Sequence, residues 1–154
     1  MNVTDFHDAK SELKRAEHLL YVSLKYTRTV DVIKSVIDRL VSGIEILIDK
    51  MLEYAKVKRK IKEIPASVTI KCDTIKKVFD DEKIIDFINF YLMLRKIQKA
   101  KYKRSCEYRK HVTMTALVED TIININLVVI KEYYEKTLAF LEFAKELTGV
   151  KKPE

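Results

Sequence analysis

Arg104 and His111 are the residues of this sequence whose types and spacing best suit a chemical reaction. Six residues separate them. A histidine can accept or donate a proton when a ribose 2′-hydroxyl attacks its own phosphate, and an arginine can stabilise the negative charge that develops there. His111 is also the one histidine in a basic stretch, and an unperturbed histidine titrates between pH 5 and 8. The pair predicts RNA-cleaving chemistry. The alternative is a solvated basic surface, where an arginine often lies this close to a histidine.

Both residues belong to the basic stretch, which we define as residues 95–111. It holds eight Lys or Arg and one acid, Glu107, so its formal charge is +7. The whole chain, with 30 basic and 23 acidic residues, has the same net charge, so the remaining residues balance. Phosphate groups bind where cations are concentrated, and tyrosines can stack on unpaired bases. We therefore expect RNA or another polyanion to contact Lys99, Lys101, Tyr102, Lys103, Arg104, Tyr108, Arg109 and Lys110.

Motifs for other chemistries are absent from the sequence. It has no glycine-rich phosphate loop, no CxxC pair, no HExxH and no Glu-x-x-His spacing. His7 and His18 are eleven positions apart on one predicted helix, which separates them by about 16 Å and prevents them from sharing a metal. No metal and no cofactor is predicted.

The elements that must position these residues are mostly helices. Gly and Pro occur only twice each, which is too little turn punctuation for a mainly β fold. Apolar residues recur every three or four positions, which is typical of amphipathic helices. The first predicted helix begins near Thr4 or Asp5, and its apolar stripe reaches Leu24 before a short connection at residues 26–29. The second runs from Thr29 or Asp31 to about Lys60. The others span roughly Ser67–Phe79, Glu82–Tyr102 and Val129–Leu147.

Gly43 lies in the middle of the second predicted helix. A glycine there costs about 1 kcal/mol relative to alanine. Together with Ser42 it either lets another helix come close or is a tolerated defect.

The period of the sequence changes after the basic stretch. Val112, Met114, Ala116 and Val118 alternate with other residues, and a second alternating run follows around Ile123 and Ile125. This pattern predicts a β-hairpin over about residues 111–127, although a continued helix is the alternative. The predicted fold is therefore a single domain, 1–154, that is mainly all-α: an up-and-down bundle of four to five helices with one small β-hairpin before the last helix.

Long amphipathic helices, a basic segment and an Arg-x6-His spacing resemble the HEPN domains, a family of small all-α proteins. The resemblance implies that Arg104 and His111 match the family's motif. Active members cleave RNA without a metal at a dimer interface, and inactive relatives bind nucleotides or RNA. Two features depart from the family: Ser105 follows the arginine where a polar Asn, Asp or His is common, and His111 is predicted at a strand rather than on a helix.

A non-catalytic helical module that forms a homodimer is the alternative function. Its motivation is the apolar breadth of residues 36–48 and 87–94, which favours self-association into a homo-oligomer. No apolar run approaches the roughly 20 residues that cross a bilayer, so no membrane is expected. Cys72 and Cys106 do not suggest a disulfide framework, which favours a cytoplasmic protein.

Overall fold

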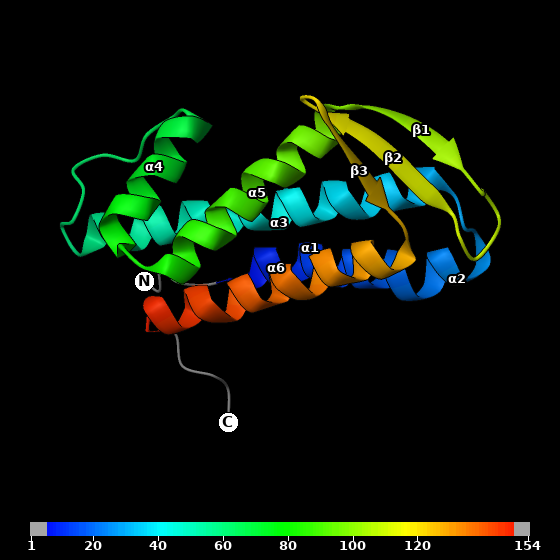
Figure 1. The fold of residues 1–154 in the computed structure, drawn as a ribbon. Coiled ribbons are helices and arrows are strands. Elements are labelled where there is room, and N and C mark those ends of the chain that lie inside the picture. Colours follow the sequence, from blue (N-terminus) through cyan, green and yellow to red (C-terminus); the bar gives the residue numbers. More distant parts are fainter. Residues whose placement is uncertain (1–5, 150–154) are drawn as a thin grey trace.

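A computed structural model describes residues 6–149, which form a mainly helical fold around one central helix, α3 (Val30–Val57). α1 (His7–His18) and α6 (Leu127–Leu147) pack along α3, and α5 (Glu82–Lys99) crosses it (Figure 1). Successive long helices run in alternating directions, as an up-and-down bundle requires. The predicted fold class is confirmed.

The first helix changes its winding before it ends. After α1 the chain forms a π-helical segment, η1 (Leu19–Ser23), and a final turn, α2 (Leu24–Tyr26). Its predicted apolar stripe from Phe6 to Leu24 is buried. The predicted start at Thr4 or Asp5 lies outside the described residues.

α3 is central because its apolar face is wide enough to meet several neighbours at once. Thr29 caps it by accepting a hydrogen bond from the Val32 N–H at 3.3 Å, and the helix ends at Val57 rather than near Lys60. α1 crosses at Gly43, where an added Cβ would lie 3.6 Å from the Glu12 Cβ. Another helix does pass beside Gly43, but 3.6 Å is an ordinary van der Waals distance, so this contact would also accommodate an alanine.

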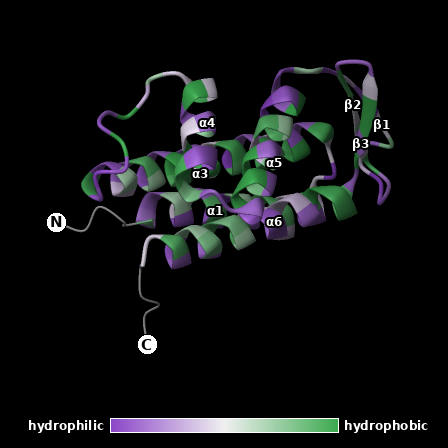
Figure 2. Ribbon diagram, turned by 60° about the vertical axis from the view of Figure 1, so that its left-hand side comes forward, coloured by the Kyte–Doolittle hydropathy of each residue, from purple (hydrophilic) through white to green (hydrophobic). Residues whose placement is uncertain are grey.

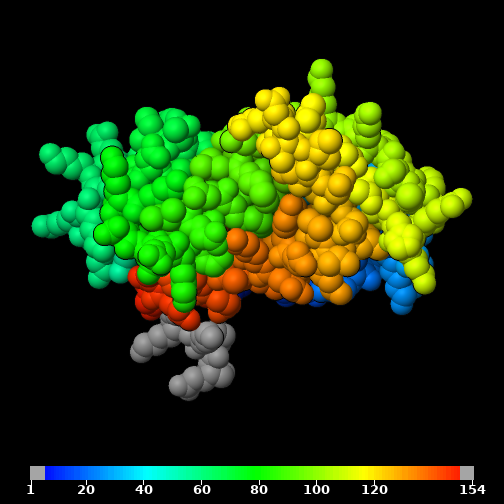
Figure 3. Space-filling model, viewed as in Figure 1, coloured from blue at the N-terminus to red at the C-terminus, as the bar shows by residue number. Residues whose placement is uncertain are grey.

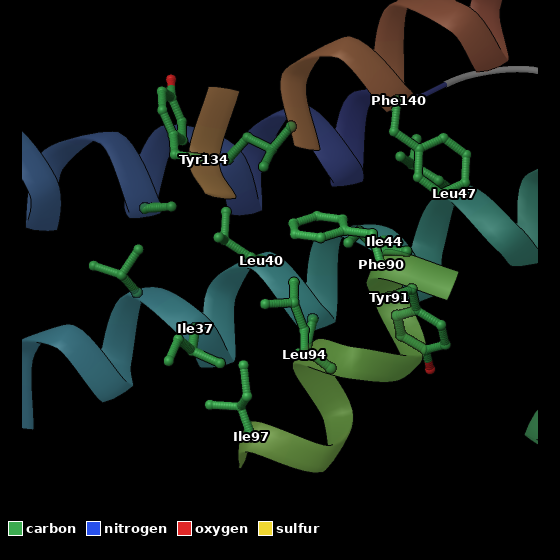
Figure 4. Close-up of a cluster of buried hydrophobic side chains, with 14 of the residues drawn as sticks. Ile37, Leu40, Ile44, Leu47, Phe90, Tyr91, Leu94, Ile97, Tyr134 and Phe140 are labelled. Atoms are coloured by element: carbon green, nitrogen blue, oxygen red, sulfur yellow. The ribbon is translucent and has the colours of Figure 1, made fainter. Parts of the chain in front are cut away.

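The core lies where α3, α5 and α6 meet (Figure 4). Apolar residues recur on the inward sides of these helices, as the hydropathy colouring shows (Figure 2). Two tyrosines at its edge reach polar partners, as buried hydroxyls usually must. Tyr91 donates to Glu45 and Tyr134 to Glu17, both at 3.1 Å. Burial, and then the hydrogen bond to Glu17, raises the pKa of Tyr134 to about 12.

The apolar surfaces from which a homodimer was predicted are packed largely against other elements of the same chain. Val36, Ile44 and Ile48 on α3 are buried, and so are Ile88 and Leu94 on α5. They pack on other elements of the same chain, so they no longer argue for a partner copy. Among the described residues, no helix combines the length and apolarity that a membrane crossing needs.

A three-stranded antiparallel sheet lies at one end of the bundle, over the N-terminal half of α3 (Figure 1). Its strands are β1 (Lys101–Ser105), β2 (Thr113–Val118) and β3 (Thr121–Ile125), in the order β1-β2-β3. β2 and β3 form the predicted hairpin, joined by a two-residue turn in which Glu119 has a left-handed backbone, φ 55°. At the opposite end, the short helix α4 (Val68–Phe79) packs on α3 and α5.

The predicted helix over Glu82–Tyr102 is wrong in its last turn. α5 ends at Lys99, and Ala100 already has an extended backbone. Tyr102 and Arg104 pair with Ala116 and Met114 of β2, so ladder hydrogen bonds and inward packing outweigh the local helix preference of a lysine-rich segment. The last helix also begins at Leu127, not Val129, because the Asn126 side chain caps it.

Candidate nucleic-acid interface

The basic stretch divides among three elements: the end of α5, strand β1 and the loop 106–112 that joins β1 to β2. In β1 successive side chains point to opposite faces of the sheet. Tyr102 and Arg104 share a face with the buried Ala116 and Met114, whereas Lys101 and Lys103 point the other way. We call the first the inner face and the second the outer face. The stretch therefore does not present its charge as one patch.

Arg104 is compensated within the protein. Its Nη2 donates to Asp31 Oδ1 at 2.8 Å and to the Tyr102 hydroxyl at 3.1 Å, and its Nη1 lies 3.7 Å from Glu107 Oε1. The hydrogen bond from Arg104 is the main cause that holds the pKa of Asp31 below its usual value. Lys34 covers the Tyr102 ring at 4.5 Å. The predicted contacts Tyr102 and Arg104 thus lie in a satisfied cluster beside α3.

The outer face has the opposite character. Lys101 and Lys103 are exposed, and neither forms an ion pair with any residue between 6 and 149. Beside Lys101, Leu117 of β2 and Ile122 of β3 are 51% and 65% exposed. A shallow depression of about 380 Å³ is lined here by Lys101, Lys103, Thr115, Leu117 and Ile122, together with Tyr102 and Ala116. Apolar surface beside unpaired cations suits a ligand with both bases and phosphates.

The loop 106–112 follows β1 at the end of the sheet opposite the hairpin turn. The loop is anchored beside the start of α3 by one backbone and one side-chain hydrogen bond: the Tyr108 N–H donates to the Arg28 carbonyl at 2.6 Å, and the Glu107 carboxylate accepts from the Val30 N–H at 3.2 Å. Cys106 and Tyr108 have left-handed backbones, φ 54° and 66°, a strain of order 1–3 kcal/mol each that is common at functional sites.

The loop side chains point into solvent. Tyr108 is 76% exposed, and Arg109 and Lys110 are exposed without an ion pair in the described part of the chain. The space-filling view shows side chains of this region projecting from the sheet end (Figure 3). An anchored backbone that presents an aromatic ring and two free cations is suited to an extended anionic chain.

Arg104 and His111 lie on different elements, a strand and a loop. The His111 carbonyl accepts from the Thr113 hydroxyl at 2.7 Å, while its exposed imidazole has no hydrogen bond or ion pair within residues 6–149. Within residues 6–149 no hydrogen bond or ion pair joins it to Arg104. Of the other predicted contacts, Lys99 is exposed at the end of α5, and the neighbouring Lys96 pairs with Glu119 of the hairpin turn at 2.8 Å.

Neither cysteine suggests a metal or redox centre. Cys72 is buried and Cys106 is exposed, and both are free thiols. Among the described residues, no group of three or more His, Cys, Asp or Glu is placed to hold a metal ion.

Two features of the site were missed from the sequence. Asp31 is 73 positions from its partner Arg104, and no local pattern shows such a pair. The sequence places Leu117 and Ile122 in a hairpin but does not show that their side chains are exposed. Their exposure depends on β1, which completes the sheet and defines its outer face.

No protein-family model, no curated protein and no solved structure matches this chain. The function must therefore be argued from the site itself.

Proposed function

We propose that the protein binds single-stranded RNA through one continuous surface, the outer surface, formed by the outer face of the sheet and the loop 106–112. The observation that carries this proposal is the contrast in ion pairing. Arg104 on the inner face has two carboxylate partners, whereas four neighbouring cations have none within residues 6–149. The outer surface comprises Lys101, Lys103, Tyr108, Arg109, Lys110, Leu117 and Ile122.

Each component of this surface has a role in the proposed complex. Lysine and arginine side chains neutralise phosphates and release the counterions condensed on them, which makes affinity depend on salt. Exposed Tyr108 offers a ring on which an unpaired base can stack. Leu117 and Ile122 give the bases an apolar floor between the phosphate contacts. A single strand is favoured over a duplex because it exposes its bases to such contacts.

We propose binding without cleavage, as in an inactive relative of the HEPN domains. The Arg104 guanidinium already faces Asp31 and Glu107, so a phosphate there would have to displace carboxylates. His111 lies in the adjoining loop and, within residues 6–149, has no hydrogen bond to Arg104. The family resemblance itself stays a prediction. The alternative, a non-catalytic homodimer, has less support since its apolar surfaces pack inside the chain.

The test removes the four free cations of the outer surface together. Lys101, Lys103, Arg109 and Lys110 are replaced by Gln, and affinity for an oligouridylate is measured over a range of salt concentrations. We expect the affinity to fall about 10²-fold near physiological salt and the salt slope to fall by about 3, since each single-strand phosphate contact contributes about 0.7.

A matched control removes the same charge at the other end of the molecule. Lys56, Arg59, Lys62 and Lys77 are exposed and lie around the end of α3 and on α4, far from the sheet (Figure 1). Replacing these four by Gln should leave most of the affinity and slope intact. Equal losses in the two quadruple variants would show that only net charge matters and that the outer surface is not the RNA site.

Cleavage is tested separately with wild type and His111→Ala in the presence of EDTA. We expect both proteins to bind RNA equally and neither to cleave it. Metal-independent cleavage that falls about 10²–10⁴-fold in His111→Ala would contradict the proposal and favour general acid–base catalysis by that residue.

A further inference from the structure

A second cationic site lies on elements that the outer surface does not use. It is a groove of about 240 Å³ between the η1–α2 segment and the start of α6. Three cations reach it from three places: Lys25 in α2, Arg28 in the connection to α3, and Lys131 in the second turn of α6. No acid lines it. The complete lining is Leu20, Tyr21, Leu24, Lys25, Arg28, Leu127 and Lys131.

The three cations lack anionic partners inside the protein. Within residues 6–149 none of them forms an ion pair. The Arg28 Nε is excluded from solvent and has no hydrogen-bond acceptor. A buried donor on a charged group that stays unsatisfied is costly, and native structures contain few of them. Because this nitrogen is closed to solvent, an anion in the groove would instead meet the terminal nitrogens of the same guanidinium and compensate its charge there.

The backbone around the groove holds Arg28 in place. The Arg28 carbonyl accepts the Tyr108 N–H at 2.6 Å, so the residue is tied to the loop of the basic stretch. The preceding helix is locally π-helical over Leu19–Ser23, a winding that occurs often at functional sites. Leu127 is the first residue of α6, so the positive end of that helix dipole also lies at the groove.

Tyrosines stand beside the cations. Tyr21 lines the groove, and its ring lies 5.1 Å from the Lys131 Nζ and packs edge-on against Tyr134. Tyr26, next to Lys25, is 78% exposed. Together they put aromatic faces beside groups that attract phosphate. Aromatic rings of this kind stack on bases, whatever the base.

We propose that this groove binds the phosphate group of a nucleotide unit, with Arg28, Lys25 and Lys131 directed at the phosphate oxygens and a tyrosine beneath the base. Arginine is suited to this role because its fork of donors matches phosphate oxygens. The same chemistry is offered by a free mononucleotide and by one nucleotide within an RNA strand. The groove and the outer surface share no side chain, although the backbone hydrogen bond from Tyr108 to Arg28 joins them.

The test compares a groove variant with a charge-matched control. The groove variant replaces Lys25, Arg28 and Lys131 by Gln, and the control replaces Lys56, Arg59 and Lys62 by Gln. Affinities for AMP and for an oligouridylate are measured by calorimetry. We expect the groove variant to lose about tenfold or more, since charge-assisted hydrogen bonds are removed, and the control to change little.

The two ligands identify the source of the phosphate. If wild type binds AMP and the groove variant does not, the ligand is a free nucleotide. If even wild type does not bind AMP, and oligouridylate binding is weakened only in the groove variant, the phosphate belongs to RNA. Unchanged affinity for both ligands, relative to the control, would overturn the proposal.

If the triple variant does not fold, Lys25→Gln with Lys131→Gln replaces it, because both lysines are exposed. Unchanged affinity in this double variant would equally overturn the proposal. If the groove substitutions still lower the affinity of a protein that already carries the four outer-surface substitutions, the groove is a binding site even if the outer surface is not.

Discussion

The two faces of the small sheet differ although one five-residue strand contributes to both. On the inner face, Arg104 is held by Asp31, Glu107 and the Tyr102 hydroxyl, above buried Met114. On the outer face, Lys103, its neighbour in the chain, has no anionic partner in the described part of the protein. The inner cation is a structural group, and the outer cation is available to a ligand.

This difference shows that summed charge is a poor measure of a binding surface. The basic stretch carries +7, but Lys96 and Arg104 are paired with carboxylates inside the protein. What remains for a ligand depends on which face each side chain occupies. The alternation of a strand separates residues that a helix would have spread over one broad surface.

The largest expected difference between the faces is in stability. Met114→Ala should lower the free energy of unfolding by about 2–5 kcal/mol, because Met114 is fully buried on the inner face. Leu117→Ala on the outer face should change it by less than about 0.5 kcal/mol. Urea unfolding followed by circular dichroism measures both. Similar losses for the two variants would mean that the outer face is covered and is not open to a ligand.

The next largest effect concerns the aromatic ring of the outer surface. Tyr108→Ala should weaken oligouridylate binding by about 1–3 kcal/mol, the range for removing one base-stacking ring. Tyr108→Phe keeps the ring and serves as the matched control, with affinity close to wild type. Fluorescence anisotropy is a suitable measurement. If alanine and phenylalanine behave alike, the ring does not stack on a base.

The smallest effect is the pH dependence of the inner-face ion pair, because both of its side chains reach solvent. The pKa of Asp31 is lowered in the folded protein by Arg104. The pair therefore contributes stability above the unfolded pKa of the carboxyl group, and that contribution is lost as pH falls through the lower folded value. The stability difference between wild type and Arg104→Gln should be constant from neutral pH to about pH 5 and should narrow below about pH 4. If urea titrations give the same stability difference between wild type and Arg104→Gln at pH 7 and pH 3, Arg104 does not stabilise the fold through the Asp31 carboxylate.

Much of the helical fold could be predicted because its cause is local. The stripe from Phe6 to Leu24 and the wide face of α3 are periodic in the sequence, and both are buried as expected. The hairpin followed from the alternation around Met114 and Ile125. Periodicity survives in the fold because one face of each element must be removed from water.

Strand β1 could not be predicted in the same way. Lys101–Ser105 has no apolar alternation of its own, and it becomes a strand because β2 offers backbone partners. Asp31 meets Arg104 across 73 positions, and the groove beside Arg28 combines segments from opposite ends of the chain. Such non-local pairings leave no periodic pattern in a single sequence.

The most direct test of the central claim compares two adjacent residues of β1 that differ in face. Lys103→Gln and Arg104→Gln each remove one positive charge, and the salt dependence of oligouridylate binding is measured for both beside wild type. We predict that Lys103→Gln lowers the slope by about 0.7, one single-strand phosphate contact, while Arg104→Gln leaves it unchanged. A lowered slope for Arg104→Gln with an unchanged slope for Lys103→Gln would contradict this claim and place the RNA on the inner-face cluster instead.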